Sequence, residues 1–144
     1  MIQNIKNIEL TEINYNQLCE LYSIFKKINK NIFSFNKLKE IIKKLPDNHN
    51  IYLFFKDNEI IGAITLIIEQ KIIHDGKCVG HIEDYVIKEE HRKTEVSSML
   101  LNYVKILCEQ NNCYKIILDC NPLLEEYYNK KGYKNNGINM AYYF

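Results

Sequence analysis

Three β-rich runs follow one another in the middle of the chain, and this block constrains the fold more than any other feature. The runs cover Ile51–Lys56, Ile60–Ile73 and Cys78–Ile87, and the turn-forming pairs Asp57-Asn58 and Asp75-Gly76 separate them. Connections this short join neighbouring antiparallel strands. The block therefore predicts three consecutive antiparallel strands of one sheet.

Helical patterns lie on both sides of this block. A short first strand is predicted over Ile8–Ile13, and a helix is predicted over Tyr15–Ile28. A second helix begins after Ser34, a typical N-cap residue. Apolar positions from Val96 to Cys108 recur at helical spacing, which predicts a third helix.

The last third of the chain predicts two further strands around a short helix. Cys113–Cys120 is typical of a strand buried on both faces, which places it at the centre of the sheet. Asn121 and Pro122 open a short helix that Gly132 ends, and Tyr133–Phe144 is predicted as the last strand. The order β-α-α-β-β-β-α-β-α-β is that of an α/β (α+β) domain with a mixed sheet.

Composition narrows the classes of function. The length of 144 residues suits one domain, and 19 basic against 18 acidic side chains give a net charge of +1, too little for a nucleic acid or anionic membrane partner. Neither a membrane span nor a signal peptide is recognisable, which favours a cytoplasmic location. The five cysteines have no CxxC spacing, so we expect buried free thiols and no metal site.

Two adjacent carboxylates stand inside the third β-rich run. Glu83 and Asp84 are residue types that sheets disfavour, and strand alternation points them to opposite faces. An edge strand with solvated carboxylates explains them, and so does an acidic functional site. The residues alone leave both interpretations open.

The segment that leads into the third predicted helix contains the only arginine of the chain, Arg92. Backbone N–H groups at the start of a helix hold anionic phosphates well, so this segment is a candidate phosphate site. A charged turn with Thr94 as the N-cap explains the same residues.

Two other pairs of residues have a functional and a structural explanation. Asp119 ends an apolar strand and Tyr128 follows on the next helix; both suit acid–base chemistry, but a turn carboxylate and a packed phenol are the common cases. Lys71 and His74 lie three residues apart at the end of a long strand. Together they suit a phosphate monoester, and they equally suit an exposed hairpin end.

Four blocks of sequence form a recognisable set. They are EQKIIH (Glu69–His74), GHIED (Gly80–Asp84), CYKIILDC (Cys113–Cys120) and YYNKKGY (Tyr127–Tyr133). In order and spacing these blocks resemble glucosamine 6-phosphate N-acetyltransferases, which belong to the GCN5-related acetyltransferase (GNAT) superfamily. The resemblance covers about Ile60–Met140, and residues 1–144 are identified by it as a single domain of this kind.

The resemblance implies a GNAT fold in which the fourth strand (Cys78–Ile87) and the fifth strand (Cys113–Cys120) splay apart around acetyl-CoA, the co-substrate. Splayed strands leave backbone N–H and C=O groups unpaired, and the pantetheine amides form hydrogen bonds with these groups as an added strand would. The cofactor-binding residues that it implies are Tyr85, Val86, Ile87, Arg92, Lys93, Thr94, Glu95, Val96 and Ser97, the last six as the pyrophosphate loop.

The resemblance also implies direct acetyl transfer to the 2-amino group of glucosamine 6-phosphate, giving N-acetylglucosamine 6-phosphate and CoA in the hexosamine pathway to UDP-N-acetylglucosamine. Tyr128 would protonate the departing sulfur, while Glu83, Asp84 and Asp119 would orient the amine and accept its proton. The implied substrate-binding residues are Lys71, Ile72, Ile73, His74, Glu83, Asp84 and Asp119. A homodimer is implied as well, in which C-terminal strands contribute to the partner's site.

The sequence departs from this family at the pyrophosphate loop. The family pattern Gln-x-x-Gly-x-Gly/Ala corresponds to Arg92–Ser97, with Lys93, Glu95 and Ser97 where relatives have glycine. The alternatives are therefore a non-catalytic acyl-CoA-binding module of the same fold and an acetyltransferase for another amine, such as a protein N-terminus, a lysine or a polyamine.

A second departure concerns the substrate phosphate. Relatives carry a basic residue near the C-terminus, but the tail here reads Met140–Phe144 without one. A threonine expected after the first helix corresponds to Phe25 and Lys26. Lys26 or Lys30 is a candidate substitute as a phosphate ligand.

Overall fold

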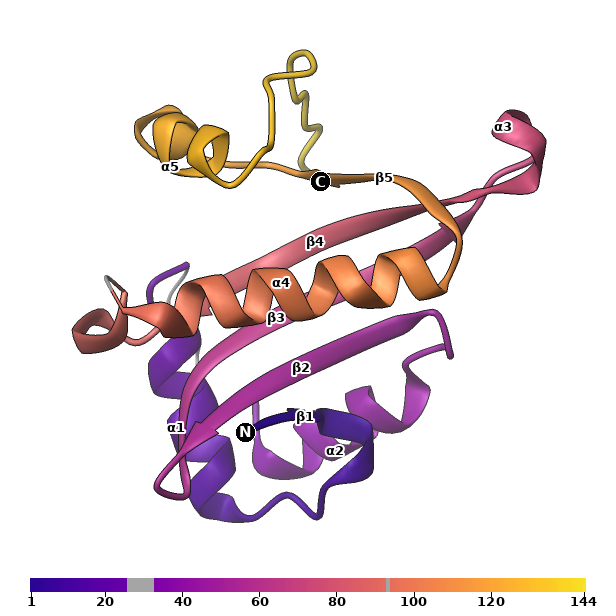
Figure 1. The fold of residues 1–144 in the computed structure, drawn as a ribbon. Coiled ribbons are helices and arrows are strands. Elements are labelled where there is room, and N and C mark those ends of the chain that lie inside the picture. Colours follow the sequence, from indigo (N-terminus) through magenta and orange to yellow (C-terminus); the bar gives the residue numbers. More distant parts are fainter. Residues whose placement is uncertain (26–32, 93) are drawn as a thin grey trace.

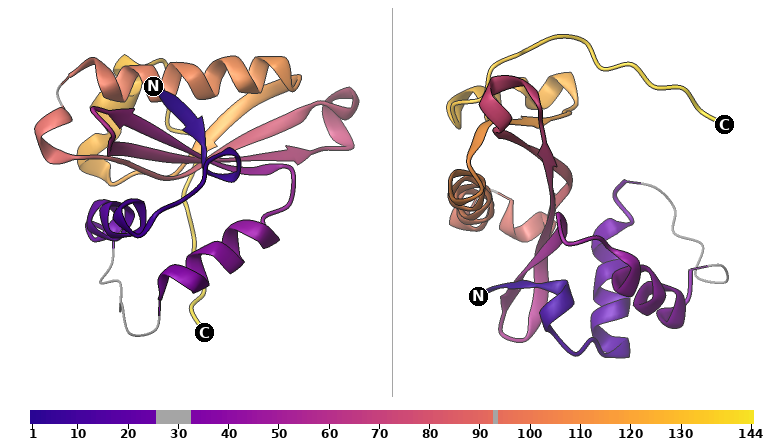
Figure 2. Two further views of the ribbon diagram at one scale, coloured as in Figure 1. Left: turned by 90° about the horizontal axis from the view of Figure 1, so that it is seen from below. Right: turned by 90° about the vertical axis from the view of Figure 1, so that its right-hand side faces the viewer.

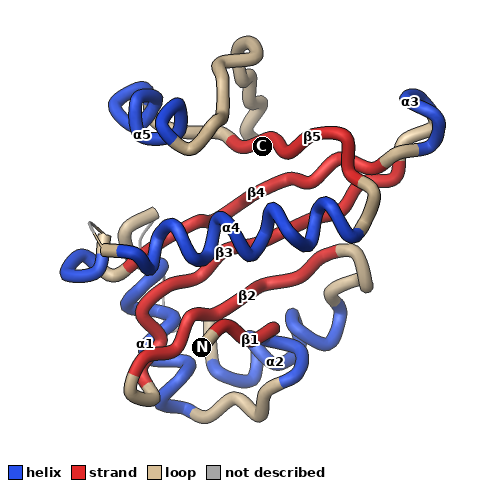
Figure 3. Tube along the Cα trace, in the orientation of Figure 1, coloured by secondary structure: helices blue, strands red, loops and turns tan. Residues whose placement is uncertain are grey.

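A computed structural model describes residues 1–25, 33–92 and 94–144 of the chain. The strands in this part of the chain form a five-stranded sheet with the order β1-β2-β3-β4-β5 (Figure 3). They are β1 (Ile2–Asn4), β2 (His49–Lys56), β3 (Glu59–Gln70), β4 (Cys78–Ile87) and β5 (Cys113–Leu118). The first four strands pair antiparallel, and β5 pairs parallel to β4.

Helices cover both faces of the sheet. Helix α4 (Glu95–Gln110) lies on one face, and α1 (Glu12–Tyr22) and α2 (Phe35–Lys44) lie on the other (Figures 1 and 2). Two shorter helices, α3 (Ile73–Gly76) and α5 (Glu125–Lys130), follow β3 and β5, and 3-10 turns occupy residues 5–7, 89–91 and 122–124. No helix in the described ranges is long and apolar enough to cross a membrane.

The core has a layer on each face of the sheet because side chains alternate along the strands. Ile64 and Leu66 of β3 pack in one cluster with Leu100 of α4. Ala63, the residue before Ile64, packs in the other cluster with Leu18 of α1. Strand β3 is therefore buried on both faces along much of its length, which matches its nearly continuous apolar sequence.

The pairing between β4 and β5 covers only the first half of β4. It runs from Cys78–Cys113 to Ile82–Leu118. Beyond that point β5 ends, while β4 continues to Ile87 and stays paired with β3. Figure 1 shows the two strands diverging at this end. The splayed fourth and fifth strands implied by the sequence are confirmed.

Several local predictions are confirmed too. Ile51–Ile87 contains three antiparallel strands, and the bounds of β4 are those predicted. Ser34 caps α2 by accepting a hydrogen bond from the Lys37 amide at 3.2 Å. Asn121 caps the turn before α5 in the same way, through the Leu123 amide at 3.0 Å. Caps are local interactions, so sequence alone locates them.

The N-terminal predictions are wrong in part. Among the described residues, Ile8–Ile13 forms no strand: the short β1 lies before it and pairs with β2. Helix α1 begins directly after Thr11, which forms a capping box with Asn14. The helix expected over Tyr15–Ile28 is shorter than predicted, because α1 ends at Tyr22. Residues 26–28 of the predicted range lie outside the described residues.

The predictions for strand ends and for the C-terminal segment are also corrected. Strand β5 lies at the edge of the described sheet, not at its centre, and its residues are mostly half-buried. Strand β3 ends at Gln70, and Ile73 begins α3 instead. Within the described residues, Tyr133–Phe144 is irregular and not a strand. Figure 2 shows this segment running away from the body on the side of α1 and α2. The apolar residues of these segments are not buried within a single chain, so their sequence alone predicted the wrong structure.

Candidate functional site

A β-bulge in β4 shapes the surface beyond the fork between β4 and β5. The register shifts so that two residues of β4, Asp84 and Tyr85, stand opposite Ile64 alone. Asp84 adopts a left-handed conformation with φ 46°, which costs free energy in a non-glycine residue. Bulges are common beside active sites because they re-aim side chains. Here the bulge re-aims the predicted acidic pair.

Peptide groups of β4 are open on the side that β5 has left. The Lys88 amide donates to the Ile61 carbonyl at 2.8 Å, so Lys88 pairs with β3. Peptide groups in a strand point alternately to its two sides, so the N–H and C=O of Ile87 point away from β3. The Ile87 carbonyl accepts a hydrogen bond from Arg92 Nε at 3.1 Å. The edge beyond Ile82 thus offers backbone donors and acceptors to a ligand.

The acidic residues of β4 and β5 gather at the fork. Glu83 is largely exposed, but partial desolvation raises its pKa, and the nearby carboxylates of Asp119 and Asp84 raise it further. Asp119 follows β5 directly and accepts a hydrogen bond from Asn139 Nδ2 at 2.6 Å. The structure therefore brings together three of the predicted catalytic residues, and their mutual repulsion makes Glu83 a stronger proton acceptor than an ordinary glutamate.

Tyr128 lies on α5, the helix that follows β5. Its side chain is buried, and this burial raises its pKa, with the neighbouring Tyr127 contributing. The two rings meet edge to face with their centroids 5.0 Å apart. The phenol therefore stays protonated at neutral pH, and it is available to donate a proton or a hydrogen bond.

Tyr85 links β4 to both neighbouring helices. Its hydroxyl donates to the Ser97 carbonyl, in the first turn of α4, at 2.9 Å. The same hydroxyl lies 3.4 Å from the hydroxyl of Tyr127 on α5. This side chain therefore spans the region between β4 and the helices at the fork.

The predicted pyrophosphate loop leads into α4. Thr94 caps this helix, with its hydroxyl accepting a hydrogen bond from the Val96 amide at 3.4 Å. Glu95 is exposed in the first turn, whereas Ser97 is buried and donates to the Thr94 carbonyl at 3.3 Å. Lys93 lies outside the described residues. The N-cap role of Thr94 is confirmed, and phosphate binding at this turn stays a prediction.

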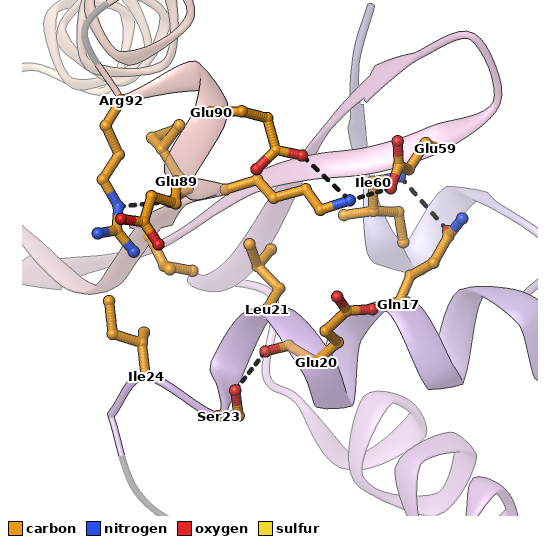
Figure 4. A pocket seen from close by; sticks show the side chains of 13 residues that line it. Gln17, Glu20, Leu21, Ser23, Ile24, Glu59, Ile60, Glu89, Glu90 and Arg92 are labelled. Atoms are coloured by element: carbon orange, nitrogen blue, oxygen red, sulfur yellow. Dashed lines mark hydrogen bonds and ion pairs between the residues drawn. The ribbon is translucent and has the colours of Figure 1, made fainter.

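Cavities lie on two sides of these residues. One of about 450 Å³ lies between the C-terminal part of α1 and the end of β4, and Val86, Ile87 and Arg92 line it (Figure 4). Another of about 1220 Å³ lies between β5, α5 and the C-terminal segment, and Asp119 and Tyr128 line it. Predicted cofactor-binding residues therefore face one cavity, and predicted catalytic residues face another.

The predicted phosphate-binding block lies at the other end of β4 from the bulge. Lys71 forms an ion pair with Glu69. His74 stacks on the ring of Tyr114, with the centroids 3.9 Å apart. The two residues between them, Ile72 and Ile73, are exposed. Lys71 and His74 therefore have different partners in this structure, and it does not bring them together.

His81 is a site residue to which the sequence analysis assigned no role. Its Nε2 lies 2.7 Å from Oε2 of Glu69, and it stands two residues before Glu83 on the same strand. Residues two apart share a face of a strand. That spacing from a candidate catalytic carboxylate is the sequence signal that points to His81.

Comparison with known protein families decides the class of the chain. The model of the acetyltransferase (GNAT) family matches residues 15–133. The chain belongs to this GNAT family. The matched range of the GNAT domain includes the fork between β4 and β5, the three carboxylates and Tyr128. The family implied by the four sequence blocks is confirmed.

Individual GNAT relatives are named for one reaction. The chain is 32% identical over 108 residues to glucosamine 6-phosphate N-acetyltransferase of Candida albicans, covering 74% of this chain and 72% of that protein. It is 35% identical over 105 residues to glucosamine 6-phosphate N-acetyltransferase 1 of Dictyostelium discoideum, covering 71% and 66%. The crystal structure of glucosamine-6-phosphate N-acetyltransferase from Arabidopsis thaliana matches with a TM-score of 0.83 at 22% identity, over 100% of this chain and 99% of that one, which shows the common fold.

Other expectations for this GNAT chain concern cysteines, metals and lysines. All five cysteines are free; Cys19 and Cys108 are buried, whereas Cys120 is exposed. Within the described residues, no group of three or more His, Cys, Asp or Glu side chains is placed to hold a metal ion. Lys26 and Lys30, the candidate phosphate ligands, lie outside the described residues.

Proposed function

We propose that this GNAT protein is a glucosamine 6-phosphate N-acetyltransferase and that residues 1–144 act as one catalytic domain. The observation that carries the proposal is the open edge of β4 beyond Ile82, which is flanked by Glu83 and Asp119. The names of the relatives in Candida and Dictyostelium support the same substrate. The products are N-acetylglucosamine 6-phosphate, a hexosamine on the route to UDP-N-acetylglucosamine, and CoA.

The open edge suits acetyl-CoA as the co-substrate. Pantetheine contains two amide groups, and amides pair with an exposed strand edge as an added strand does. Ile87 supplies an outward N–H group, and Tyr85 lies in the bulge where β3 pairing is interrupted. A backbone donor at this edge also stabilises the oxyanion of a tetrahedral intermediate. The guanidinium of Arg92, beside the Ile87 carbonyl, adds positive charge for the pyrophosphate.

The carboxylates suit the sugar amine. An ammonium group must lose a proton before its nitrogen attacks the thioester carbon, and Glu83 accepts this proton because partial desolvation and its acidic neighbours raise its pKa. Asp84 and Asp119 attract the ammonium form of the substrate and orient it. Attack is direct, so the acetyl group moves from sulfur to nitrogen in one transfer.

Tyr128 suits the departing sulfur. Collapse of the tetrahedral intermediate releases a CoA thiolate, which is a poor leaving group in a dry site. The Tyr128 phenol is protonated at neutral pH, and burial raises its pKa further, so it donates a hydrogen bond to the sulfur and transfers its proton only as charge builds up there. The attacking nitrogen is positively charged in the tetrahedral intermediate and loses its second proton to solvent as the amide forms, and the phenol regains its proton from solvent after release.

The substrate phosphate is assigned to Lys71 and His74 in a homodimer. At about 3.3 Å per residue, β4 rises roughly 17 Å between Cys78 and Glu83, so the hairpin before β4 stands well away from the carboxylates of its own chain. The proposal therefore requires a homodimer in which the hairpin of the second copy lies beside these carboxylates. Exposed aromatic side chains of the C-terminal segment, Tyr142, Tyr143 and Phe144, also suit burial against a second copy.

A cytoplasmic location is part of the proposal. All five cysteines are free, and unpaired thiols are typical of a reducing compartment. The phosphorylated sugar is itself an intracellular type of metabolite because its charge prevents passage through a bilayer.

The proposal is tested by CoA release from acetyl-CoA with a panel of purified amines. We expect rapid release with glucosamine 6-phosphate and much slower release with unphosphorylated glucosamine. Release only with a polyamine or a lysine peptide would refute the substrate. Acetyl-CoA binding by calorimetry without release from any amine would instead indicate a non-catalytic acyl-CoA-binding module.

A further inference from the structure

A polar stripe crosses the sheet face that carries α1 and α2, and the proposed reaction leaves part of it without a role. The stripe consists of Lys71, Glu69, His81 and Glu83. Ile67 of β3 pairs with His81, and residues two apart share a face, so Glu69 and Glu83 lie on the same face as His81. The side chains of Lys71, His81 and Glu69 are 30%, 27% and 41% exposed, so α1 and α2 leave this part of the face open to water.

Glu69 joins the two basic members of the stripe. Its Oε1 forms an ion pair with Lys71 Nζ, and its Oε2 lies 2.7 Å from His81 Nε2. Hydrogen bonds from Lys71 and His81 hold the pKa of Glu69 below its ordinary value. Glu69 is therefore ionised at neutral pH and only accepts hydrogen bonds, so Nε2 of His81 must carry a hydrogen. In the neutral ring Nδ1 then carries the lone pair and is the basic atom.

We propose that His81, oriented by Glu69, carries the proton of the substrate ammonium from Glu83 to solvent. This rests on the proposed function. The ammonium group gives one proton to the Glu83 carboxylate and becomes the attacking amine. The protonated Glu83 passes that proton to Nδ1 of His81, directly or through a water molecule, and becomes a carboxylate again. The imidazolium then releases the proton to water, and the neutral ring is restored.

The charges around His81 favour this path. Glu69 on β3 contacts the imidazole, Glu83 on β4 lies on the same face two residues further along the strand, and Asp119, directly after β5, lies near Glu83. Lys71 opposes them, but Glu69 neutralises its charge. Glu83 holds a proton more tightly than an ordinary glutamate because its pKa is raised.

The test uses His81→Gln, which keeps an N–H donor for Glu69 but accepts no proton. With glucosamine 6-phosphate we expect kcat to fall roughly tenfold, less than the roughly 100-fold of a direct general acid–base effect, because His81 acts through Glu83. The KM for acetyl-CoA should stay unchanged, and added imidazole should restore kcat because it replaces the missing proton carrier. His91→Gln, on the turn at residues 89–91, is the matched control and should keep the wild-type kcat.

Three results would overturn the relay. The first is a wild-type kcat in His81→Gln at every pH, and the second is a slow variant whose kcat imidazole does not restore. The third is a wild-type His81 ring that carries its hydrogen on Nδ1. The tautomer is measured by ¹⁵N NMR of the wild-type protein, so it does not depend on a variant that folds. We expect the Nε2–H form, and the Nδ1–H form contradicts the geometry. Absence of wild-type turnover with glucosamine 6-phosphate refutes the proposed function itself, whereas normal wild-type turnover with an unaffected His81→Gln refutes only the relay.

Discussion

Ile82 and Leu118 form the last residue pair between β4 and β5. The next residue along the chain is acidic in both cases: Glu83 on β4 and Asp119 directly after β5. Two carboxylates in adjacent positions repel each other and retain water, so they do not continue a sheet ladder. The fork therefore begins where both strands change from apolar to acidic sequence, and the same carboxylates become part of the candidate active site.

Replacing the phenol of Tyr128 should slow the chemical step without weakening cofactor binding. Phenylalanine keeps the buried ring but removes the proton donor for the departing thiolate. We expect Tyr128→Phe to lower kcat roughly 100-fold, the size of a typical general acid–base effect. Steady-state kinetics measures kcat, and calorimetry measures the Kd for CoA, which should stay the same.

A neighbouring tyrosine provides the control for this variant. The Tyr133 ring packs edge to face on Tyr128, and its hydroxyl is buried with no hydrogen-bond partner among the described residues. Tyr133→Phe should keep kcat and raise the free energy of unfolding by about 1 kcal/mol, because it removes an unsatisfied buried group. An equal loss of kcat in both variants would mean that Tyr128 acts through packing alone.

Removing the charge of Glu83 should lower the activity of the protein and raise its stability. Because its pKa is raised in the folded state, Glu83 stabilises the fold below the ordinary value of about 4.3, and this stabilisation is lost as pH rises through the raised folded pKa. At neutral pH the charged Glu83 opposes folding. Glu83→Gln should therefore lower kcat and raise Tm, and the gain in Tm should grow with pH in thermal melts. A variant that is less stable than the wild type at neutral pH would contradict this account.

Gly80 should tolerate no side chain while Cys108 is present. A Cβ at this position of β4 would overlap Sγ of Cys108, which is buried on α4. Gly80→Ala should lower the free energy of unfolding by about 2 kcal/mol, as overpacking of a core does. Denaturant unfolding measures this change. Cys108→Ala added to Gly80→Ala should recover part of the loss, and purely additive effects would show that the two positions do not interact.

The C-terminal segment should be needed for dimer formation. Its aromatic residues Tyr142, Tyr143 and Phe144 are exposed in the single chain, at 80% or more of their full surface. Light scattering of the full chain should give the mass of a dimer, and deletion of residues 140–144 should shift the mass towards a monomer. A full chain that is monomeric at all concentrations would refute the homodimer.

Local sequence signals predicted more of the fold than long-range ones did. The caps at Ser34 and Asn121 were predicted because each acts within three residues. The capping box of Thr11 and Asn14 is an equally local signal that would have placed the start of α1. By contrast, the apolar sequence of β5 does not indicate which segment of the chain packs against this strand. The predicted central position in the sheet was therefore wrong.

The candidate site also has features that the sequence indicated and features that depend on the register of the strands. The residue types alone left the roles of Glu83, Asp119 and Tyr128 open, the resemblance to the acetyltransferase family assigned them, and the fold places the two carboxylates together. The left-handed backbone at Asp84 was not predictable, because only the register of a neighbouring strand forces a non-glycine residue into it. The Glu69–His81 contact joins residues 12 apart in sequence across two strands, so it too depends on register.

Acetyl-CoA is expected to pair with the edge of β4 beyond Ile82. Residue-resolved amide hydrogen exchange, measured by NMR with and without acetyl-CoA, tests this most directly. We predict that acetyl-CoA slows exchange of the outward Ile87 amide and of the amides in the bulge, while the Lys88 amide, already bonded to Ile61, changes little. Saturation with acetyl-CoA that leaves the exchange of Tyr85 and Ile87 unaltered would contradict this expectation.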